Sequence, residues 1–147
     1  MECIGGTNSG MQARLLLVHS PLVGCGTWEP IARDLGGDGY AVSVPGLVGT
    51  VTAGPPYHVR QAQEIARSAA GQPAILIGHS GAGPLLATAG TMLGKDVRGY
   101  IFVDAGLPTP GRSWMDTVPP ISRRSCGEWP IRRAGCRRGR NGGTRTN

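Results

Sequence analysis

Residues 74–86 read AILIGHSGAGPLL, and this stretch decides the fold class. Four apolar residues typical of a buried strand lead through Gly78 to a serine at position 80, and Pro84 follows where a helix can begin. Ser80 is therefore expected in a tight turn between a strand and a helix. It is either a nucleophile held on that turn or only a helix cap in a glycine-rich corner. A phosphate-binding loop is not favoured, because the stretch lacks the third glycine of GxGxxG and no GK[ST] follows it.

The rest of the body alternates between apolar strand patterns and amphipathic helix patterns. Continuous apolar runs are typical of strands buried on both faces of a parallel sheet, and Thr27 is a plausible N-cap for the first helix. The predicted fold class is α/β, a mainly parallel sheet with flanking helices. The predicted strands are 14–18, 40–44, 74–78 and 99–103, and the predicted helices are 27–37, 58–71 and 84–93.

Charge divides the 147 residues unevenly. Residues 1–111 carry six Lys or Arg and seven Asp or Glu, whereas residues 112–147 carry nine Arg and two acidic residues. The last segment has no helix or strand period and few aliphatic residues, which is typical of disorder. We expect a flexible N-terminus over 1–13, one domain over 14–110, and an Arg/Gly-rich disordered tail over 111–147.

Composition also bears on partners and location. The arginines of the tail could bind nucleic acid through phosphate charge, but their irregular spacing favours a solvated tail, so nucleic-acid binding is an alternative only. The four cysteines show no metal-ligand spacing, and we expect free thiols, no metal and no cofactor. No signal peptide and no membrane-length apolar run is visible, which predicts a cytoplasmic protein that does not enter a membrane.

Two loops are expected to meet at the candidate site, because the carboxyl ends of parallel strands share one edge of a sheet. One loop follows Val18 and the other contains the motif Gly78-His79-Ser80-Gly81-Ala82, which fits GxSxG with alanine last. Small residues at 78 and 82 allow the strand and helix to approach closely. The Gly81 N–H, at the start of the helix, would then face a developing oxyanion.

From residue 14 to 110 the chain resembles the α/β-hydrolase family. The matching pieces follow the order of that family's third to sixth strands, and they read LLLVHSPLVGCGTWEPIARDL, YAVSVPGL, PAILIGHSGAGPLL and GYIFVDAGLP. The resemblance implies a partial fold of this type and a serine hydrolase that cleaves a small ester-like molecule. Ser80 would attack the carbonyl, and the loop from His19 through Ser20 to Leu22 would help to hold the oxyanion.

The chain departs from the family pattern at the oxyanion loop and at the base. Pro21 has no N–H to donate, so Leu22 would have to supply the second oxyanion donor. The family's catalytic histidine follows the serine and the acid in sequence, but no histidine follows His79 here. Asp104, at the end of the last predicted strand, is the candidate acid. His58 is the remaining candidate for a substitute base.

The family's later strands are not visible in the sequence, so one edge of the sheet is expected to be open. Exposed sheet edges recruit other chains. We therefore expect an esterase-type serine hydrolase that is weak or inactive as this chain. The alternatives are a catalytically silent fragment that binds a partner, or itself, through the open edge, and nucleic-acid binding through the tail.

Overall fold

The computed structural model describes residues 13–112 and 116. The chain divides into two units, residues 1–117 and 118–147, and every described residue belongs to the first. The predicted flexible N-terminus and the predicted disordered tail lie almost entirely outside the described residues. Their disorder, and nucleic-acid binding by the tail, therefore stay predictions.

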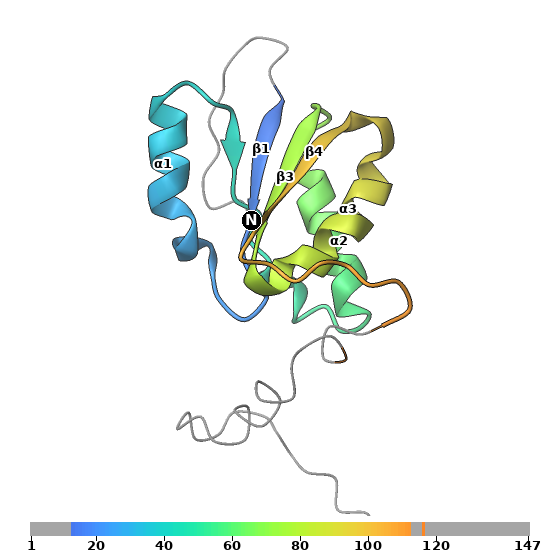
Figure 1. Cartoon of the computed structure of the whole chain (residues 1–147). Helices are drawn as coiled ribbons and strands as arrows, with labels where there is room; N and C mark the ends of the chain where they lie inside the picture. The colour runs from blue at the N-terminus through green and yellow to red at the C-terminus, as the bar shows by residue number, and fades with distance from the viewer. Residues whose placement is uncertain (1–12, 113–115, 117–147) are drawn as a thin grey trace, which may run out of the picture. The chain divides into compact units, whose positions relative to one another are not determined.

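In the described part of the chain, four parallel strands form one sheet in the order β2-β1-β3-β4 (Figure 1). This confirms the predicted parallel sheet of the α/β class. The second strand is shorter than predicted, because it pairs with its neighbour only through Val42 and Ser43. The strands are β1 (Arg14–Val18), β2 (Val42–Ser43), β3 (Ala74–His79) and β4 (Val97–Val103).

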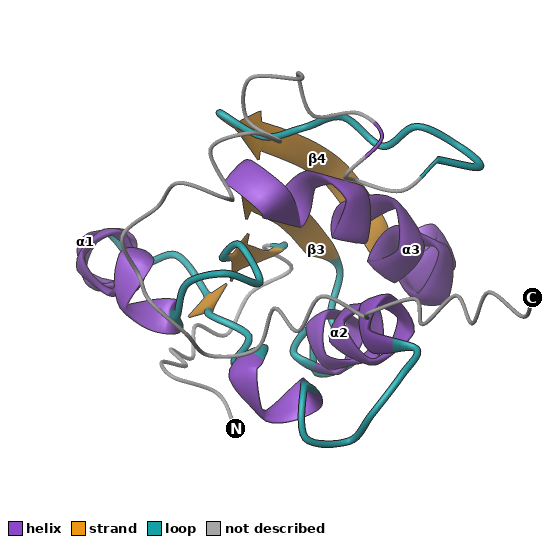
Figure 2. Ribbon diagram, turned by 90° about the horizontal axis from the view of Figure 1, so that it is seen from below, coloured by secondary structure: helices purple, strands orange, loops and turns teal. Residues whose placement is uncertain are grey.

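Among the described residues, three α-helices flank the sheet on both faces: α1 (Glu29–Gly37), α2 (Tyr57–Arg67) and α3 (Gly83–Leu93). The first lies on one face, and the other two lie together on the opposite face (Figure 2). Alternate residues of β1 point into the two cores, as expected of a strand buried on both faces. The α1 core contains Leu15, Leu17, Trp28, Ala32, Val42 and Val44, and the larger core on the other face contains Leu16, Val18, Ile65, Leu76, Leu85 and Leu86 among others.

The start of α1 differs from the prediction. Trp28, and not Thr27, is the N-cap residue, and Thr27 ends a short 3-10 turn over Cys25–Thr27. No side chain caps the helix, whereas Pro30 lies in the first turn as predicted. The Trp28 side chain is buried in the α1 core, and this packing explains why the cap preference of Thr27 does not set the boundary.

The strand order places the candidate site. The chain passes from β1 to β2 on one side and then to β3 on the other side of β1, so the winding direction reverses between β1 and β3. Ligands of open α/β sheets bind at such a reversal, beyond the carboxyl ends of the strands. In Figure 1 these ends point downward, and the loops that follow β1, β3 and β4 gather there.

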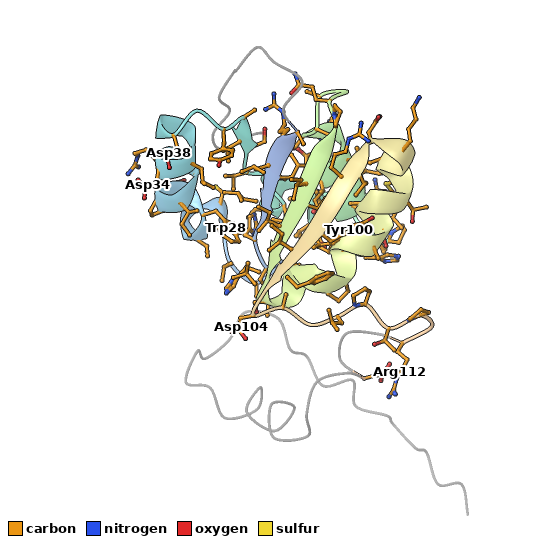
Figure 3. All side chains as sticks on the ribbon, turned by 45° about the horizontal axis from the view of Figure 1, so that its top comes forward. Trp28, Asp34, Asp38, Tyr100, Asp104 and Arg112 are labelled. Carbon is orange, nitrogen blue, oxygen red and sulfur yellow. The ribbon has the colours of Figure 1, made fainter. Side chains whose placement is uncertain are left out.

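Strand β4 is an edge of the sheet as far as the structure describes it. Ile101 is paired with Ile77, whose side chain packs on the α1 core, and Ile101 and Val103 are 47% and 38% exposed. Tyr100 lies on the other face, where its hydroxyl closely approaches Gly90 of α3 (Figure 3). The face of β4 that is turned away from α3 is therefore apolar and partly exposed among the described residues.

Candidate active site

Ser80 lies on a strained turn between β3 and α3. Its φ is +55°, a left-handed conformation that costs a non-glycine residue about 1–3 kcal/mol. The residue follows directly on the last residue of β3 and opens a 3-10 turn over Ser80–Ala82 that leads into α3. The N-cap of α3 is Ala82, and no side-chain hydrogen bond caps the helix. Ser80 therefore does not act as the cap of this helix.

Close packing explains the small residues around the turn. A Cβ placed on Gly78 would lie 2.9–3.1 Å from side-chain carbons of Leu86 in α3. Ala82 is fully buried. A Cβ on Gly83 would overlap the carbonyl oxygen of Gly106, which belongs to the loop after β4. The turn can form because strand, helix and loop all approach one another at positions without large side chains.

The loop after β1 meets the turn, as the parallel sheet predicts. Val18 is paired with Gly78, so the next residues of both strands leave the sheet side by side. A Cβ placed on Gly81 would lie only 3.0 Å from Ser20 Oγ. The Ser20 hydroxyl and the backbone of Gly81 are therefore neighbours across the two loops.

His19 holds the loop after β1 in place. Its side chain is fully buried, and its Nδ1 lies 2.8 Å from the carbonyl oxygen of Ser20. Its Nε2 accepts a hydrogen bond from the N–H of Leu47 at 3.4 Å. Since Nε2 accepts, Nδ1 carries the proton and donates a hydrogen bond to the Ser20 carbonyl oxygen. Both ring nitrogens are thus engaged, and this histidine positions the loop.

The loop around Pro21 offers few free donors. Leu22, the predicted second oxyanion donor, has an N–H that donates to Ser20 Oγ at 3.3 Å, and its side chain is exposed. The N–H of Val23 donates to the Ser20 carbonyl oxygen at 3.1 Å. The described structure therefore commits the Leu22 N–H to the serine hydroxyl.

Asp104 lies directly after β4, on the other side of the turn from Ser20. Val103 is paired with His79, so Asp104 and Ser80 are the next residues of neighbouring strands. Asp104 has a φ of +44° and is exposed at the lower tip of the sheet (Figure 3). The register brings it beside the turn, but it is not among the residues that line the cleft described below.

His79 packs away from the cleft, against Trp28. The two rings are perpendicular, with centroids 6.2 Å apart. Trp28 Nε1 and His79 Nδ1 are buried and have no hydrogen-bond partner among the described residues. His79 thus belongs to the packing on the α1 face.

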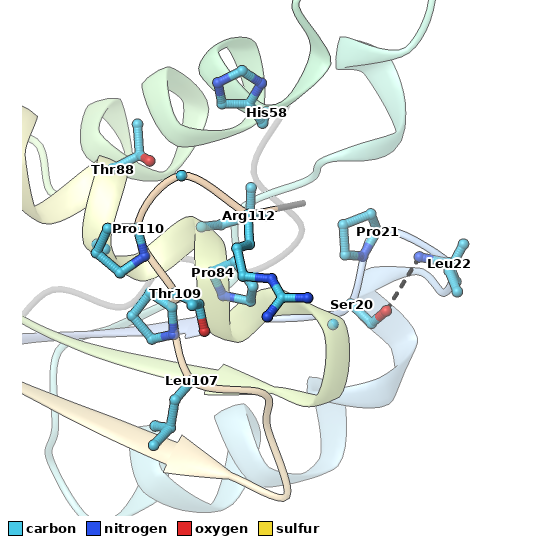
Figure 4. Close-up of a pocket in the computed structure, with 15 residues that line it drawn as sticks. Ser20, Pro21, Leu22, His58, Pro84, Thr88, Leu107, Thr109, Pro110 and Arg112 are labelled. Atoms are coloured by element: carbon cyan, nitrogen blue, oxygen red, sulfur yellow. Dashed lines mark hydrogen bonds between the residues drawn. The ribbon is translucent and has the colours of Figure 1, made fainter. Parts of the chain in front are cut away.

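A cleft of about 720 Å³ opens beside the turn (Figure 4). Its walls come from the loop after β1, the start of α3, the first turn of α2 and the segment after β4, and most of them are apolar. The lining includes Ser20, Pro21, Leu22, His58, Gly81, Pro84, Leu85, Leu107, Pro108 and Arg112. The cleft is of the size that small-molecule sites have.

Residues 15–143 match the sequence profile of the alpha/beta hydrolase family. That match covers well over half of the chain.

This chain belongs to the alpha/beta hydrolase family.

A solved alpha/beta hydrolase has the same fold. It is an extracellular enzyme from a Paenibacillus species, described as sharing structural and functional homology with tobacco salicylic acid binding protein 2. The two structures superpose with a TM-score of 0.66 at 23% sequence identity, over 79% of this chain and 50% of that one. Comparison with curated proteins found no match. The chain thus spans half the length of the solved hydrolase, and at this identity the likeness concerns the fold.

The sequence identified His58 as a candidate base but could not place it on the wall of this alpha/beta hydrolase cleft. His58 is the only one of the chain's three histidines that lines it. Sequence alone could place His58 at a helix start but could not orient that helix over the turn. The opposite wall is formed by residues 107–110, the last residues of the predicted domain, and by Gly111 and Arg112, the first two residues of the predicted tail.

Other groups in the described part of this alpha/beta hydrolase bear on the remaining predictions. Within residues 13–112 and 116, no three His, Cys, Asp or Glu side chains are placed to hold a metal ion. Nor is any helix in these residues long and apolar enough to cross a membrane. Cys25 is disulfide-bonded, which corrects the expectation of free thiols at this position.

Proposed function

We propose that this chain is a serine hydrolase that cleaves carboxylic esters through an acyl-enzyme on Ser80. The observation that carries the proposal is the strained backbone of Ser80, with φ +55°, beside Gly81 and the loop after β1. Strained non-glycine residues are retained where the surroundings hold them, and they cluster at active sites. A serine that only packed or capped a helix would not need this conformation.

The proposed reaction begins when Ser80 Oγ attacks the carbonyl carbon of the ester. Its proton passes to a base, the alcohol leaves, and the acyl group remains on the serine until water removes it. The N–H of Gly81 is the first proposed oxyanion donor. Because it lies just before α3, an 11-residue helix, the helix dipole adds to its attraction for negative charge.

The proposed base is chosen from the three histidines of the chain. His19 has both ring nitrogens engaged, and His79 packs on Trp28, so His58 on the cleft wall is the candidate. Asp104 stays the proposed acid from its register beside Ser80. It has no family-type histidine to orient, since none follows His79 in the sequence. We therefore expect slow turnover, limited by removal of the acyl group.

The cleft favours a small ester with an apolar acyl or alcohol group. Proline and leucine side chains form most of its wall near the turn, and Arg112 is a cationic residue among those that line it (Figure 4). Burial of apolar groups would supply most of the binding free energy. The ester carbonyl would lie at the end of the cleft that Gly81 and Ser20 line.

The proposal is tested by the time course of p-nitrophenyl butyrate cleavage. We expect a burst of one p-nitrophenolate per chain followed by slow release, because p-nitrophenolate leaves without needing a proton, whereas a base must activate water before it can remove the butyryl group. Ser80→Ala should abolish the burst. Ser68→Ala is the control. It removes a buried hydroxyl that donates a hydrogen bond to the Glu64 carbonyl oxygen, at the end of α2 away from His58, and it should leave the burst intact. A burst that survives Ser80→Ala would overturn the proposal.

A second candidate function rests on the exposed face of β4. Ile101 and Val103 are partly exposed on an edge strand of the described sheet. Such an edge pairs readily with another chain. Sedimentation of the chain and of Ile101→Lys tests this: a dimer that becomes monomeric in the variant supports association through β4, and a monomeric parent chain excludes it.

The predicted cytoplasmic location stays a prediction. Fractionation of producing cells tests it: recovery of the chain in the soluble intracellular fraction supports the prediction, and recovery outside the cells contradicts it.

A further inference from the structure

The second oxyanion donor is missing from the backbone of the loop after β1. Pro21 has no N–H. The N–H of Leu22 is already given to Ser20 Oγ at 3.3 Å. With both positions accounted for, a carbonyl oxygen beside Gly81 would receive only one hydrogen bond from the described backbone of this site.

The Ser20 hydroxyl has a proton to donate at the right place. A hydroxyl carries one donor and two acceptor positions, and Ser20 Oγ uses an acceptor position for Leu22. The residue lines the cleft while it is only 4% exposed, and its Oγ would lie 3.0 Å from a Cβ on Gly81. Ser20 Oγ therefore lies beside Gly81, and its O–H can rotate toward a substrate oxygen bound there.

The loop also holds the backbone of Ser20 in place. The Ser20 carbonyl oxygen accepts hydrogen bonds from His19 Nδ1 at 2.8 Å and from the N–H of Val23 at 3.1 Å. His19 is in turn held by the N–H of Leu47. A donor fixed in this way needs no reorganisation when charge develops, and such preorganisation is what makes oxyanion donors effective.

We infer that Ser20 is a catalytic residue whose hydroxyl, together with the Gly81 N–H, binds the oxyanion. The inference rests on the proposed attack by Ser80. As Ser80 Oγ bonds to the carbonyl carbon, the π electron pair of the C=O bond moves onto oxygen, and both donors hydrogen-bond to that oxygen and keep their protons. When this electron pair forms the C=O bond again, the bond between the carbon and the alcohol oxygen breaks. The base then gives the proton that it took from Ser80 Oγ to the leaving alcohol oxygen.

An alkyl fluorophosphonate tests the inference, because its phosphoryl oxygen takes the oxyanion position as the serine displaces fluoride. The test compares the wild type with Ser20→Ala and Ser20→Thr. The quantities to measure are kinact, the maximal rate of modification of Ser80, and KI, the concentration of reagent that gives half of that rate. Ser20→Ala should lower kinact by about 10²- to 10³-fold, the loss seen for a single oxyanion donor, and leave KI unchanged. Ser20→Thr keeps the hydroxyl and should retain most of the rate. The matched control is Ser68→Ala, another buried serine outside the cleft, which should react like the wild type.

If the Leu22 N–H were the second oxyanion donor, Ser20→Ala would not lower kinact. Ser20→Ala frees the Leu22 N–H from its present partner, so a site that uses Leu22 would react at the same rate or faster. That result would overturn the inference. If Ser20→Ala does not fold, Ser20→Cys keeps the size of the side chain with a much weaker donor, and an undiminished kinact in that variant would overturn it equally.

Failure of this inference differs from failure of the proposed function. A folded wild type that the fluorophosphonate does not modify at Ser80 overturns both. A wild type that is modified, with Ser20→Ala modified at the same rate, overturns only the role of Ser20.

Discussion

The backbone N–H of Gly106 donates a hydrogen bond to the carbonyl oxygen of Ser80, with 3.3 Å between nitrogen and oxygen. This bond joins the loop after β4 to the strained turn. The carbonyl oxygen of the same glycine fills the space beside Gly83 in which a side chain would stand. The turn therefore depends on contacts with a loop that lies some 25 residues further along the chain.

Gly83→Ala should destabilise the protein although alanine favours helices. The new methyl group would displace the Gly106 carbonyl, and overpacking of this kind costs about 1–3 kcal/mol. That cost exceeds the gain of about 1 kcal/mol that alanine brings over glycine in a helix. Urea denaturation followed by circular dichroism measures the net loss. Gly49→Ala is the control: a Cβ there meets nothing within 4 Å, so it should change stability by less than about 0.5 kcal/mol. Equal stabilities for both variants would contradict the close approach.

Gly78 and Leu86 should show compensating effects. Gly78→Ala pushes against the Leu86 side chain, and Leu86→Ala opens a cavity that costs about 2–5 kcal/mol. In the double variant the added methyl group occupies part of that cavity, so its loss should be smaller than the sum of the two single losses. The free energies of unfolding of the three variants measure this coupling. Strict additivity would mean that the two side chains do not meet.

Ser80→Gly should be more stable than Ser80→Ala. Both variants remove the hydroxyl, but only glycine adopts a positive φ without steric cost, and the left-handed conformation costs other residues about 1–2 kcal/mol. A thermal unfolding scan should thus show a higher Tm for the glycine variant. Identical Tm values would show that the turn is not strained at this residue.

Replacing His19 and replacing His58 should change the free energy of unfolding by different amounts. His19→Ala removes the acceptor of the Leu47 N–H inside the protein, and a buried donor without a partner costs about 1–3 kcal/mol. His58 is exposed, and His58→Ala should change stability by less than about 0.5 kcal/mol. Denaturant titrations of both variants measure the difference. A large loss from His58→Ala would contradict its place on the cleft wall.

The sheet could be predicted because its strands are short and apolar. β1 has the predicted bounds, since the run from Arg14 to Val18 is buried along its whole length. β2 could not be bounded in the same way: residues 40–44 have strand character, but only Val42 and Ser43 find partners on β1. Pairing length depends on the neighbouring strand, and a single segment does not contain that information.

Only those features of the site that depend on the turn motif and on the strand register could be predicted from the sequence. The left-handed Ser80 and the proximity of the loop after β1 follow from the turn motif and from parallel register. The hydrogen bond that occupies the Leu22 N–H depends on a side-chain rotamer of Ser20, and the place of His58 depends on how α2 packs. Neither has a signal in the local sequence.

The most direct measurement locates the adduct of a fluorophosphonate on the folded chain. Trypsin releases residues 68–95 as one peptide, and its fragment ions separate Ser80 from Ser68 and the two threonines. The account predicts one phosphonyl group, on Ser80, which is lost in Ser80→Ala. A folded chain that carries the adduct on another residue, or that takes up none, would contradict it.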